Sequence, residues 1–226
     1  MMVRMPDVRS SAAKRDNLLD RENGQAIDPG LAIDERRAPP SPDSLTVRQR
    51  DRRQRIITTA MHAMMRDDYD QVQMKDVAAE AGVALGTMYH YFTSKEHLFA
   101  EALLAWRADY FHEVAEPSSR RSVDRLKAAY RAAVAAFERH PTVYSHMMVI
   151  QASNDPLAAA LYRRFGSTQN AAFAELLKQV PSPKREQIVT VMGAVLSTNL
   201  TEFSRGRRPI AEVYDELDTA ADLLLG

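Results

Sequence analysis

Residues 73–95 read QMKDVAAEAGVALGTMYHYFTSK, and this stretch decides the fold. Its first part predicts a short helix that must end at Gly82, because glycine tolerates the left-handed backbone of a sharp turn. Residues 85–92 predict a second short helix, with Met88 and Phe92 four apart on its inner face. Two such helices are typical of a helix-turn-helix that enters the DNA major groove. A buried three-helix core that binds no nucleic acid is the alternative interpretation.

The stretch resembles the DNA-binding domain of the TetR family of transcriptional regulators. The resemblance rests on AGV at 81–83, on GTMYHYF at 86–92 and on SKEHL at 94–98. It implies an all-α fold of about nine helices, in which a three-helix DNA-binding domain precedes a C-terminal ligand-binding and dimerisation bundle. It also implies a sequence-specific repressor that a small hydrophobic ligand releases from DNA. The alternative is a DNA-binding activator or architectural protein that senses no small molecule.

The resemblance assigns DNA contacts residue by residue. Lys95, at the start of the next helix, matches a position that grips a phosphate, which helix N-termini also attract. Base edges are expected to face Leu85, Gly86, Tyr89 and His90. Phosphate or sugar contacts are expected from Thr87 and Tyr91.

An arginine cluster precedes this motif. The chain has a net charge of zero, but residues 46–66 carry six arginines and one aspartate, a local charge of +5. Phosphate binding needs a local basic patch and not a basic chain. We therefore expect a phosphate or minor-groove arm, with a solvated helix start as the alternative, formed by Arg48, Arg50, Arg52 and Arg53.

The motif departs from the family pattern at three positions. Ala84 stands where relatives commonly cap the recognition helix with Ser or Thr, a cap worth about 1 kcal/mol. Leu85 replaces a polar residue and cannot donate a hydrogen bond to a base. Gln73 stands where Ser or Thr often caps the preceding helix. We expect sequence readout to depend on Tyr89, on the arginines and on DNA shape.

Composition excludes several other classes of protein. The 226 residues contain no cysteine, which removes disulfides and zinc–thiolate sites. No stretch of 18 apolar residues is present and the N-terminus lacks a secretory signal, so we expect a cytoplasmic protein with no membrane partner. The six histidines form no Glu-x-x-His pair, and no phosphate-binding glycine loop or hydrolase motif occurs. We therefore expect no enzyme activity, no cofactor and no metal.

A proline-rich stretch and two helical stretches divide the chain into three predicted parts. Residues 1–45 hold five of the eleven prolines and predict a disordered tail. A DNA-binding domain is expected over 46–93 and a helical ligand-binding and dimerisation domain over 94–226. Thr46 is the expected cap of the first helix, and Thr93 with Glu96 forms a capping-box pattern, with Ser94 as a second candidate.

The expected apolar faces of the helices follow from their periodicity. The first helix should turn inward Ile56, Ile57, Ala60, Ala63 and Met64. Later helices are expected to begin near Pro141, Asp155-Pro156, Ser182-Pro183 and Pro209.

The resemblance implies a ligand pocket among the middle helices, where methionine and aromatic side chains suit a flexible hydrophobic ligand. Plain core is the alternative for each of its candidate residues. The candidates are Trp106, Tyr110, Tyr130, Phe137, Tyr144, Met147, Met148, Phe165 and Phe173. The VQM at 72–74 and the LDTAADLLLG at 217–226 resemble the steroid-catabolism repressors of the family, which implies a lipid, steroid-like or acyl-CoA ligand.

The resemblance also implies a homodimer with its interface on the last two helices. A two-fold protein reads a pseudo-palindromic operator with two recognition helices. The alternative is that their apolar stripes pack on their own subunit. The candidate interface residues are Ile188, Val191, Met192, Val195, Asn199, Phe203, Val213, Leu217 and Leu224.

Overall fold

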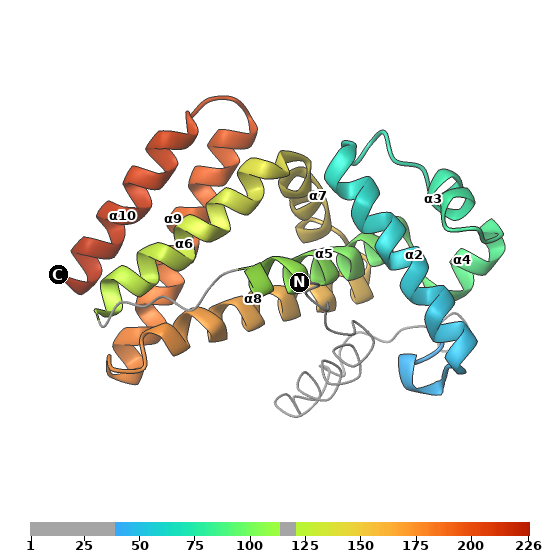
Figure 1. The fold of residues 1–226 in the computed structure, drawn as a ribbon, viewed down its shortest axis with the longest axis horizontal. Helices are drawn as coiled ribbons and strands as arrows, with labels where there is room; N and C mark the ends of the chain where they lie inside the picture. Colours follow the sequence, from blue (N-terminus) through green and yellow to red (C-terminus); the bar gives the residue numbers. More distant parts are fainter. Residues whose placement is uncertain (1–38, 114–120) are drawn as a thin grey trace, which may run out of the picture. The chain divides into compact units, whose positions relative to one another are not determined.

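The computed structural model describes residues 39–113 and 121–226, with the side chains of 109–113 outside that description. Within these ranges it contains nine α-helices, one short 3₁₀ helix and no strand, so the all-α prediction is confirmed (Figure 1). Most of the predicted disordered tail, up to residue 38, lies outside the described residues. The end of that predicted tail is structured, because Pro42–Ser44 forms the 3₁₀ helix η1 and Leu45 is buried.

The α-helices follow one another along the described chain with short connections. Their bounds are α2 Val47–Arg66, α3 Met74–Glu80, α4 Leu85–Tyr91, α5 Lys95–Glu113, α6 Ser122–Arg139, α7 Pro141–Gln151, α8 Pro156–Leu176, α9 Ser182–Ser204 and α10 Ile210–Leu225. These bounds confirm the predicted starts at Thr46, Pro141 and Asp155-Pro156 and those of the last two helices.

α2 begins with a capping box. The Thr46 hydroxyl accepts a hydrogen bond from the Gln49 N–H at 3.4 Å, and the Gln49 side chain accepts one from the Thr46 N–H at 2.8 Å. Two backbone donors that a helix start leaves free are thereby satisfied. The predicted inward stripe is confirmed by the burial of Ile56, Ile57, Ala60, Ala63 and Met64.

The turn between α3 and α4 is built on Gly82, as predicted. Gly82 has a φ of +67°, in the left-handed region where a β-carbon is strained. The Gly82 N–H donates to the Ala79 carbonyl at 3.1 Å, and the Val83 N–H donates to the Ala78 carbonyl at 3.0 Å. This pattern is a Schellman motif, which ends α3 and redirects the chain into α4.

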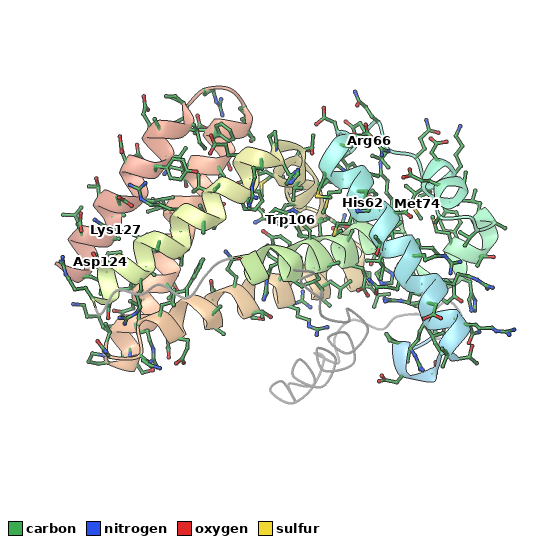
Figure 2. The ribbon with its side chains drawn as sticks, in the orientation of Figure 1. His62, Arg66, Met74, Trp106, Asp124 and Lys127 are labelled. Carbon is green, nitrogen blue, oxygen red and sulfur yellow. The ribbon has the colours of Figure 1, made fainter. Side chains whose placement is uncertain are left out.

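α3 is held against the C-terminal half of α2. Figure 2 shows Arg66 on α2 and Met74 on α3, where these two helices meet. Met74 is buried there, and an Arg66 Nη2 to Glu80 Oε2 contact of 3.6 Å joins the other end of α3. That ion pair is exposed and contributes little, so the apolar contact holds α3 in place.

α5 begins at the second of the two caps that the sequence indicated. The Ser94 hydroxyl accepts a hydrogen bond from the His97 N–H at 2.9 Å, which makes Ser94 the N-cap. The predicted Thr93–Glu96 capping box is wrong. The Thr93 hydroxyl instead donates a hydrogen bond to Asp155 at 3.0 Å. The Glu96 carboxylate accepts a hydrogen bond from the hydroxyl of Tyr69, which lies outside the helix.

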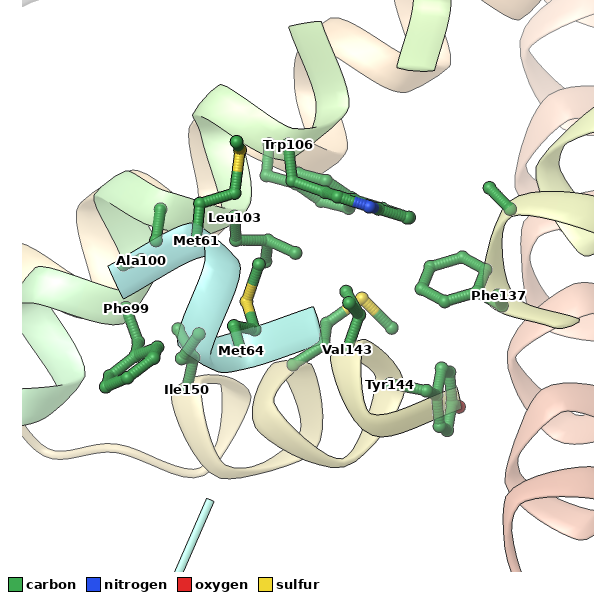
Figure 3. Packing of buried hydrophobic residues seen from close by; sticks show 14 of the residues in the cluster. Met61, Met64, Phe99, Ala100, Leu103, Trp106, Phe137, Val143, Tyr144 and Ile150 are labelled. Atoms are coloured by element: carbon green, nitrogen blue, oxygen red, sulfur yellow. The ribbon is translucent and has the colours of Figure 1, made fainter. Parts of the chain in front are cut away.

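A single apolar core connects the DNA-binding helices with the C-terminal helices. α5 packs on α2, α7 and α8, and all described residues belong to one compact unit. Figure 3 shows the contact region, with Met61, Met64, Phe99, Leu103, Trp106, Val143 and Ile150. The predicted divisions 46–93 and 94–226 therefore share one core across α2, α5 and α7.

α9 and α10 bury most of their predicted interface residues inside their own subunit. The buried ones are Ile188, Met192, Asn199, Val213 and Leu217. Val195, Phe203 and Leu224 are half-buried, and Val191 is the exposed member of the set, at 44%. For the five buried residues the predicted interface role is corrected, because an apolar stripe does not reveal which helix covers it.

Polar contacts also join α10 to its neighbours in the same subunit. Asn199 donates to Glu216 at 3.1 Å and accepts from Arg208, which pairs with Glu216 at 2.6 Å. On the other side, Lys127 of α6, labelled in Figure 2, pairs with Asp222 of α10 at 2.7 Å. These contacts fix α10 against both α6 and α9.

Candidate nucleic-acid interface

The outward face of α4 carries exposed side chains where base contacts are predicted. Leu85 is 41% exposed, Tyr89 is 51% exposed, and His90 is also exposed. Thr87 is half-buried beside them. A β-carbon on Gly86 would meet nothing within 4 Å, so a DNA backbone or base edge has room to approach there. The face can therefore offer apolar contact and single hydrogen bonds to base edges.

The inner face of α4 fastens the helix to the core. Met88 and Phe92 are fully buried, as predicted. Tyr91 is buried as well, with 2% of its surface exposed, and its ring lies 6.4 Å from that of Phe92. This placement contradicts the predicted phosphate or sugar contact of Tyr91, which instead packs in the core.

Ala84 provides no side-chain cap for α4. The helix has seven residues and is marginal by itself, so burial of its inner face must hold it. The missing cap leaves backbone N–H groups of the first turn free to donate to a phosphate.

Three of the four predicted contact arginines lie on the exposed start of α2. Arg48, Arg50 and Arg52 are exposed. Arg50 donates to the Leu45 carbonyl at 2.7 Å, which connects it to the chain entering the helix. Within the described residues Arg48 and Arg52 have no hydrogen-bond partner. Their guanidinium groups are free to neutralise phosphates.

Arg53 does not belong to that exposed group. Its guanidinium pairs with Glu101 of α5, and the pair is only 15% and 20% exposed. The guanidinium carbon also lies 5.3 Å from the centre of the Phe92 ring. The predicted DNA contact of Arg53 is therefore corrected, because this arginine joins α2 to α5 inside the domain.

Lys95 lies at the first position of α5, as predicted, and its ammonium group is held by a single neighbour. The Nζ atom donates to the Tyr69 carbonyl and lies 3.8 Å from the centre of the Tyr69 ring. Burial lowers the pKa of Lys95, against the opposing charges of Asp70 and Glu96. The ammonium has three N–H donors, so two remain for a phosphate after the bond to the carbonyl.

Two long-range hydrogen bonds connect this surface with the C-terminal helices. The Thr93 hydroxyl, directly after α4, donates to Asp155 Oδ2 at 3.0 Å, and Asp155 Oδ1 caps α8 through the Leu157 N–H at 2.8 Å. The Thr142 hydroxyl of α7 donates to the Met64 carbonyl of α2 at 2.8 Å. Sequence reasoning identified Asp155-Pro156 as a helix start, but no local pattern shows that its second oxygen reaches Thr93.

Comparison with known families agrees with this geometry. Residues 56–102 match the family model described as bacterial regulatory proteins, tetR family. Residues 120–224 match the tetracyclin repressor-like C-terminal domain. The chain belongs to the TetR family. Its function is therefore that of a DNA-binding transcriptional regulator, and this family consists of regulators and not of enzymes.

Curated TetR-family relatives cover most of the chain. The chain is 28% identical to the HTH-type transcriptional repressor KstR of Rhodococcus jostii (strain RHA1), over 79% of this chain and 84% of the relative. It is 30% identical to the proteins of the same name from Mycolicibacterium smegmatis and Mycobacterium tuberculosis, covering 89% and 82% of them. These relatives are named as repressors.

Solved structures of TetR-family regulators share the fold. A regulator from Rhodococcus sp. RHA1 matches 79% of this chain and 97% of its own, with a TM-score of 0.69 and 22% identity. A regulator from Streptomyces coelicolor matches 80% and 82%, with a TM-score of 0.62 and 23% identity. In the described ranges of the chain studied here, no helix is long and apolar enough to cross a membrane.

The predicted ligand-pocket residues of this TetR-family chain pack on one another. Trp106 and Phe137 have ring centres 5.1 Å apart, and Phe137 meets Tyr144 edge-on at 5.6 Å. Tyr130 and Phe173 are separated by 4.3 Å. All of these side chains are buried, as are Met147 and Phe165, whereas the Tyr110 side chain lies outside the described residues.

Two of the hollows on the surface of the described residues are lined by side chains other than those aromatic ones. One, of about 540 Å³, lies along the polar face of α2 and ends at Ala81. The other, of about 480 Å³, lies between Glu96 and the end of α7 and includes Met148. Met148, a predicted pocket residue, therefore borders this second hollow.

Proposed function

We propose that this TetR-family regulator is a homodimeric repressor that places α4 in the major groove of a pseudo-palindromic operator. The exposed face of α4, flanked by Lys95 and the exposed arginines of α2, is the observation that supports this proposal most. Regulators of this family bind DNA and act as dimers. Two copies would present their recognition helices about one DNA turn apart, which is the geometry that an inverted repeat requires.

Within this proposal the contacts divide into two kinds. Leu85, Gly86, Tyr89 and His90 would face base edges, and Thr87 the sugar–phosphate backbone. Phosphates would be neutralised by Arg48, Arg50, Arg52 and Lys95. The protein would act in the cytoplasm, where bacterial DNA lies.

The same proposal includes release by a small hydrophobic effector of lipid, steroid-like or acyl-CoA type. Its support is the resemblance of residues 217–226 to steroid-catabolism repressors and the methionine-rich and aromatic interior of the C-terminal helices. A ligand that binds only a DNA-incompetent arrangement lowers DNA affinity by its differential affinity for the two states. The effector would have to separate aromatic side chains that now touch.

A second candidate is favoured by that same ring packing. An activator or an architectural DNA-binding protein needs no pocket, and aromatic rings of the C-terminal helices pack directly on one another. The two candidates differ in one observable, which is release from DNA by a small molecule.

The first experiment captures genomic DNA fragments with the purified protein and sequences them. A short inverted repeat upstream of a few genes is the expected result for a dimeric, sequence-specific repressor. Diffuse, salt-sensitive capture without a shared motif would instead support an architectural protein.

The second experiment measures release of the captured operator by a sterol, a long-chain fatty acid and its CoA thioester. Release, together with a raised thermal midpoint of the free protein, would support the effector proposal. Neither effect with any of the three would favour the candidate that senses no small molecule.

A further inference from the structure

Tyr69 holds the Lys95 ammonium group from two directions. Its backbone carbonyl accepts a hydrogen bond from Nζ, and its ring lies under the same atom, 3.8 Å away. A cation over an aromatic face is attracted to the ring as well as to the carbonyl. Because both contacts come from one residue, the position of the ammonium follows the position of Tyr69.

Tyr69 is itself fixed by contacts with α5 and α7. Its hydroxyl donates to Glu96 at 2.6 Å. Its ring meets Phe99 edge-on at 5.9 Å and His146 of α7 edge-on at 5.3 Å. His146 is fully buried, and one ring nitrogen bonds the Thr142 carbonyl at 2.9 Å. The ring of Tyr69 is therefore held in one orientation by the core that the two halves of the chain share.

The hydroxyl of Tyr69 also affects the charges near Lys95. Asp70 and Glu96 are the acidic groups whose charges act on the ammonium. The Tyr69 hydroxyl donates a hydrogen bond to the Glu96 carboxylate. Within the described residues Lys95 forms no ion pair with either acid. The ammonium thus keeps its charge available for an external anion.

We infer that Tyr69 is the positioning residue for the phosphate contact of Lys95. Its ring and carbonyl set where the ammonium lies, and its hydroxyl keeps the neighbouring carboxylate from neutralising it. The inference rests on the proposed role of Lys95 as a phosphate contact. It adds that a residue outside the helix-turn-helix, in the connection before α3, determines how well that contact is made.

The test is a double-mutant cycle between Tyr69 and Lys95, measured as affinity for a labelled mixed-sequence duplex over a series of salt concentrations. Lys95→Ala should lower the slope of log affinity against log salt by about 0.9. Tyr69→Leu should weaken binding about threefold to tenfold, as expected for loss of a cation–π contact. In the Lys95→Ala background Tyr69→Leu should have no further effect. Tyr69→Phe keeps the ring but frees the Glu96 carboxylate, so it should weaken binding less than Tyr69→Leu does.

Two controls separate positioning from loss of stability. Phe137→Leu removes a buried ring far along the chain from Lys95, and its effect on DNA affinity should be the same with and without Lys95. Thermal unfolding of each variant checks that it folds. If Tyr69→Leu does not fold, Tyr69→Met fills a similar volume without a π face and takes its place.

The outcomes distinguish the inference from the proposed function. An unchanged salt slope in Lys95→Ala overturns the phosphate role of Lys95, and the inference with it. A lowered slope in Lys95→Ala, combined with equal effects of Tyr69→Leu in both backgrounds, overturns the positioning role alone. Loss of the Tyr69→Leu effect in Lys95→Ala, with the affinity of Tyr69→Phe between those of Tyr69→Leu and wild type, supports it.

Discussion

Leu85 and Tyr89 give the recognition helix an exposed apolar surface one turn long, 41% and 51% open to solvent. The apolar group that such a surface can meet in the major groove is the 5-methyl of thymine. Replacing thymine by uracil at the operator position under Leu85 should weaken binding by about 0.8 kcal/mol, roughly fourfold, because one methyl group is no longer buried. Fluorescence anisotropy with paired synthetic duplexes measures this.

The matched control for that prediction is Leu85→Ala. This variant should bind thymine and uracil duplexes alike, because the side chain that meets the methyl is gone. Equal affinity of the unaltered protein for both duplexes at every operator thymine would contradict an apolar readout by α4.

His97 makes stability depend on pH just below neutrality. Burial lowers the pKa of His97 below its ordinary value of 6.5, against the opposing charges of Glu101 and Asp155. Its Nδ1 accepts a hydrogen bond from the Thr93 N–H at 3.2 Å, which requires the neutral ring. The unfolded chain binds a proton near pH 6.5 and the folded chain does not. Stability should therefore be full above about pH 6.5 and fall at lower pH, by at most about 1.4 kcal/mol per pH unit per group.

Urea unfolding between about pH 7.5 and pH 5.5 checks this prediction. His97→Gln should reduce the pH slope without abolishing it, because burial also lowers the pKa of His146. A slope in His97→Gln equal to that of the unaltered protein would show that His97 titrates normally in the folded state.

For single residues, the sequence predicts which side of a helix faces the core, but not which side chains cover it. Periodicity correctly predicts the burial of Met88 and Phe92. Tyr91 and Arg53 were assigned to DNA by motif position and charge, and the structure places both against the core. Glu101, the partner of Arg53, lies forty-eight positions along the chain, and the core that covers Tyr91 is assembled from several helices, so a local pattern does not identify what either side chain meets.

Among the elements, the turn between α3 and α4 depends on one backbone conformation. Gly82 has a φ of +67° and no atom within 4 Å of where a β-carbon would stand. Gly82→Ala should therefore destabilise the fold by about 1–2 kcal/mol through backbone strain alone. Chemical denaturation of the full chain measures this loss.

Gly166→Ala in α8 is the matched control for the turn. Gly166 also has open space around its β-carbon position, but it lies in a helix with no positive φ. Alanine there should be neutral or stabilising by up to about 1 kcal/mol. Equal losses in the two variants would show that the turn conformation is not what Gly82 contributes.

Helix starts are the elements that sequence predicted best, because a cap acts over three or four neighbouring residues. Thr46 caps its helix as predicted, and α8 begins at Asp155-Pro156 as predicted, with Asp155 as its cap. The α5 start differs by one residue, because the Thr93 hydroxyl is engaged by Asp155, sixty-two positions away, and Ser94 takes the cap. A distant partner of this kind decides between two equally good local signals.

For the whole molecule, the exposed face of α9 is the surface on which the proposed dimer depends. Val191 is 44% exposed, and Ala194 and Thr198, on the same side of the helix, are exposed as well. Small side chains allow a second helix to approach closely. Val191→Arg should convert the dimer to a monomer, because it places an unpaired charge in an apolar contact. Sedimentation equilibrium measures the assembly state.

Ala171→Arg is the matched control for the dimer prediction. Ala171 is exposed on α8, which is not one of the two helices of the proposed dimer contact, and the same charge there should leave the assembly unchanged. A Val191→Arg protein that remains dimeric with unaltered affinity would place the subunit contact on another surface.

The bond from the Thr142 hydroxyl to the Met64 carbonyl has a practical consequence for protein engineering. Sensor chimeras are made by fusing the DNA-binding head of one regulator to the effector part of another, as though the two were independent modules. In this chain a boundary between the DNA-binding head and the effector part would cut through a shared apolar core and break a hydrogen bond between α2 and α7. A transplanted head would need a compatible α2 surface, and grafting α7 together with the head is the construction most apt to keep the response intact.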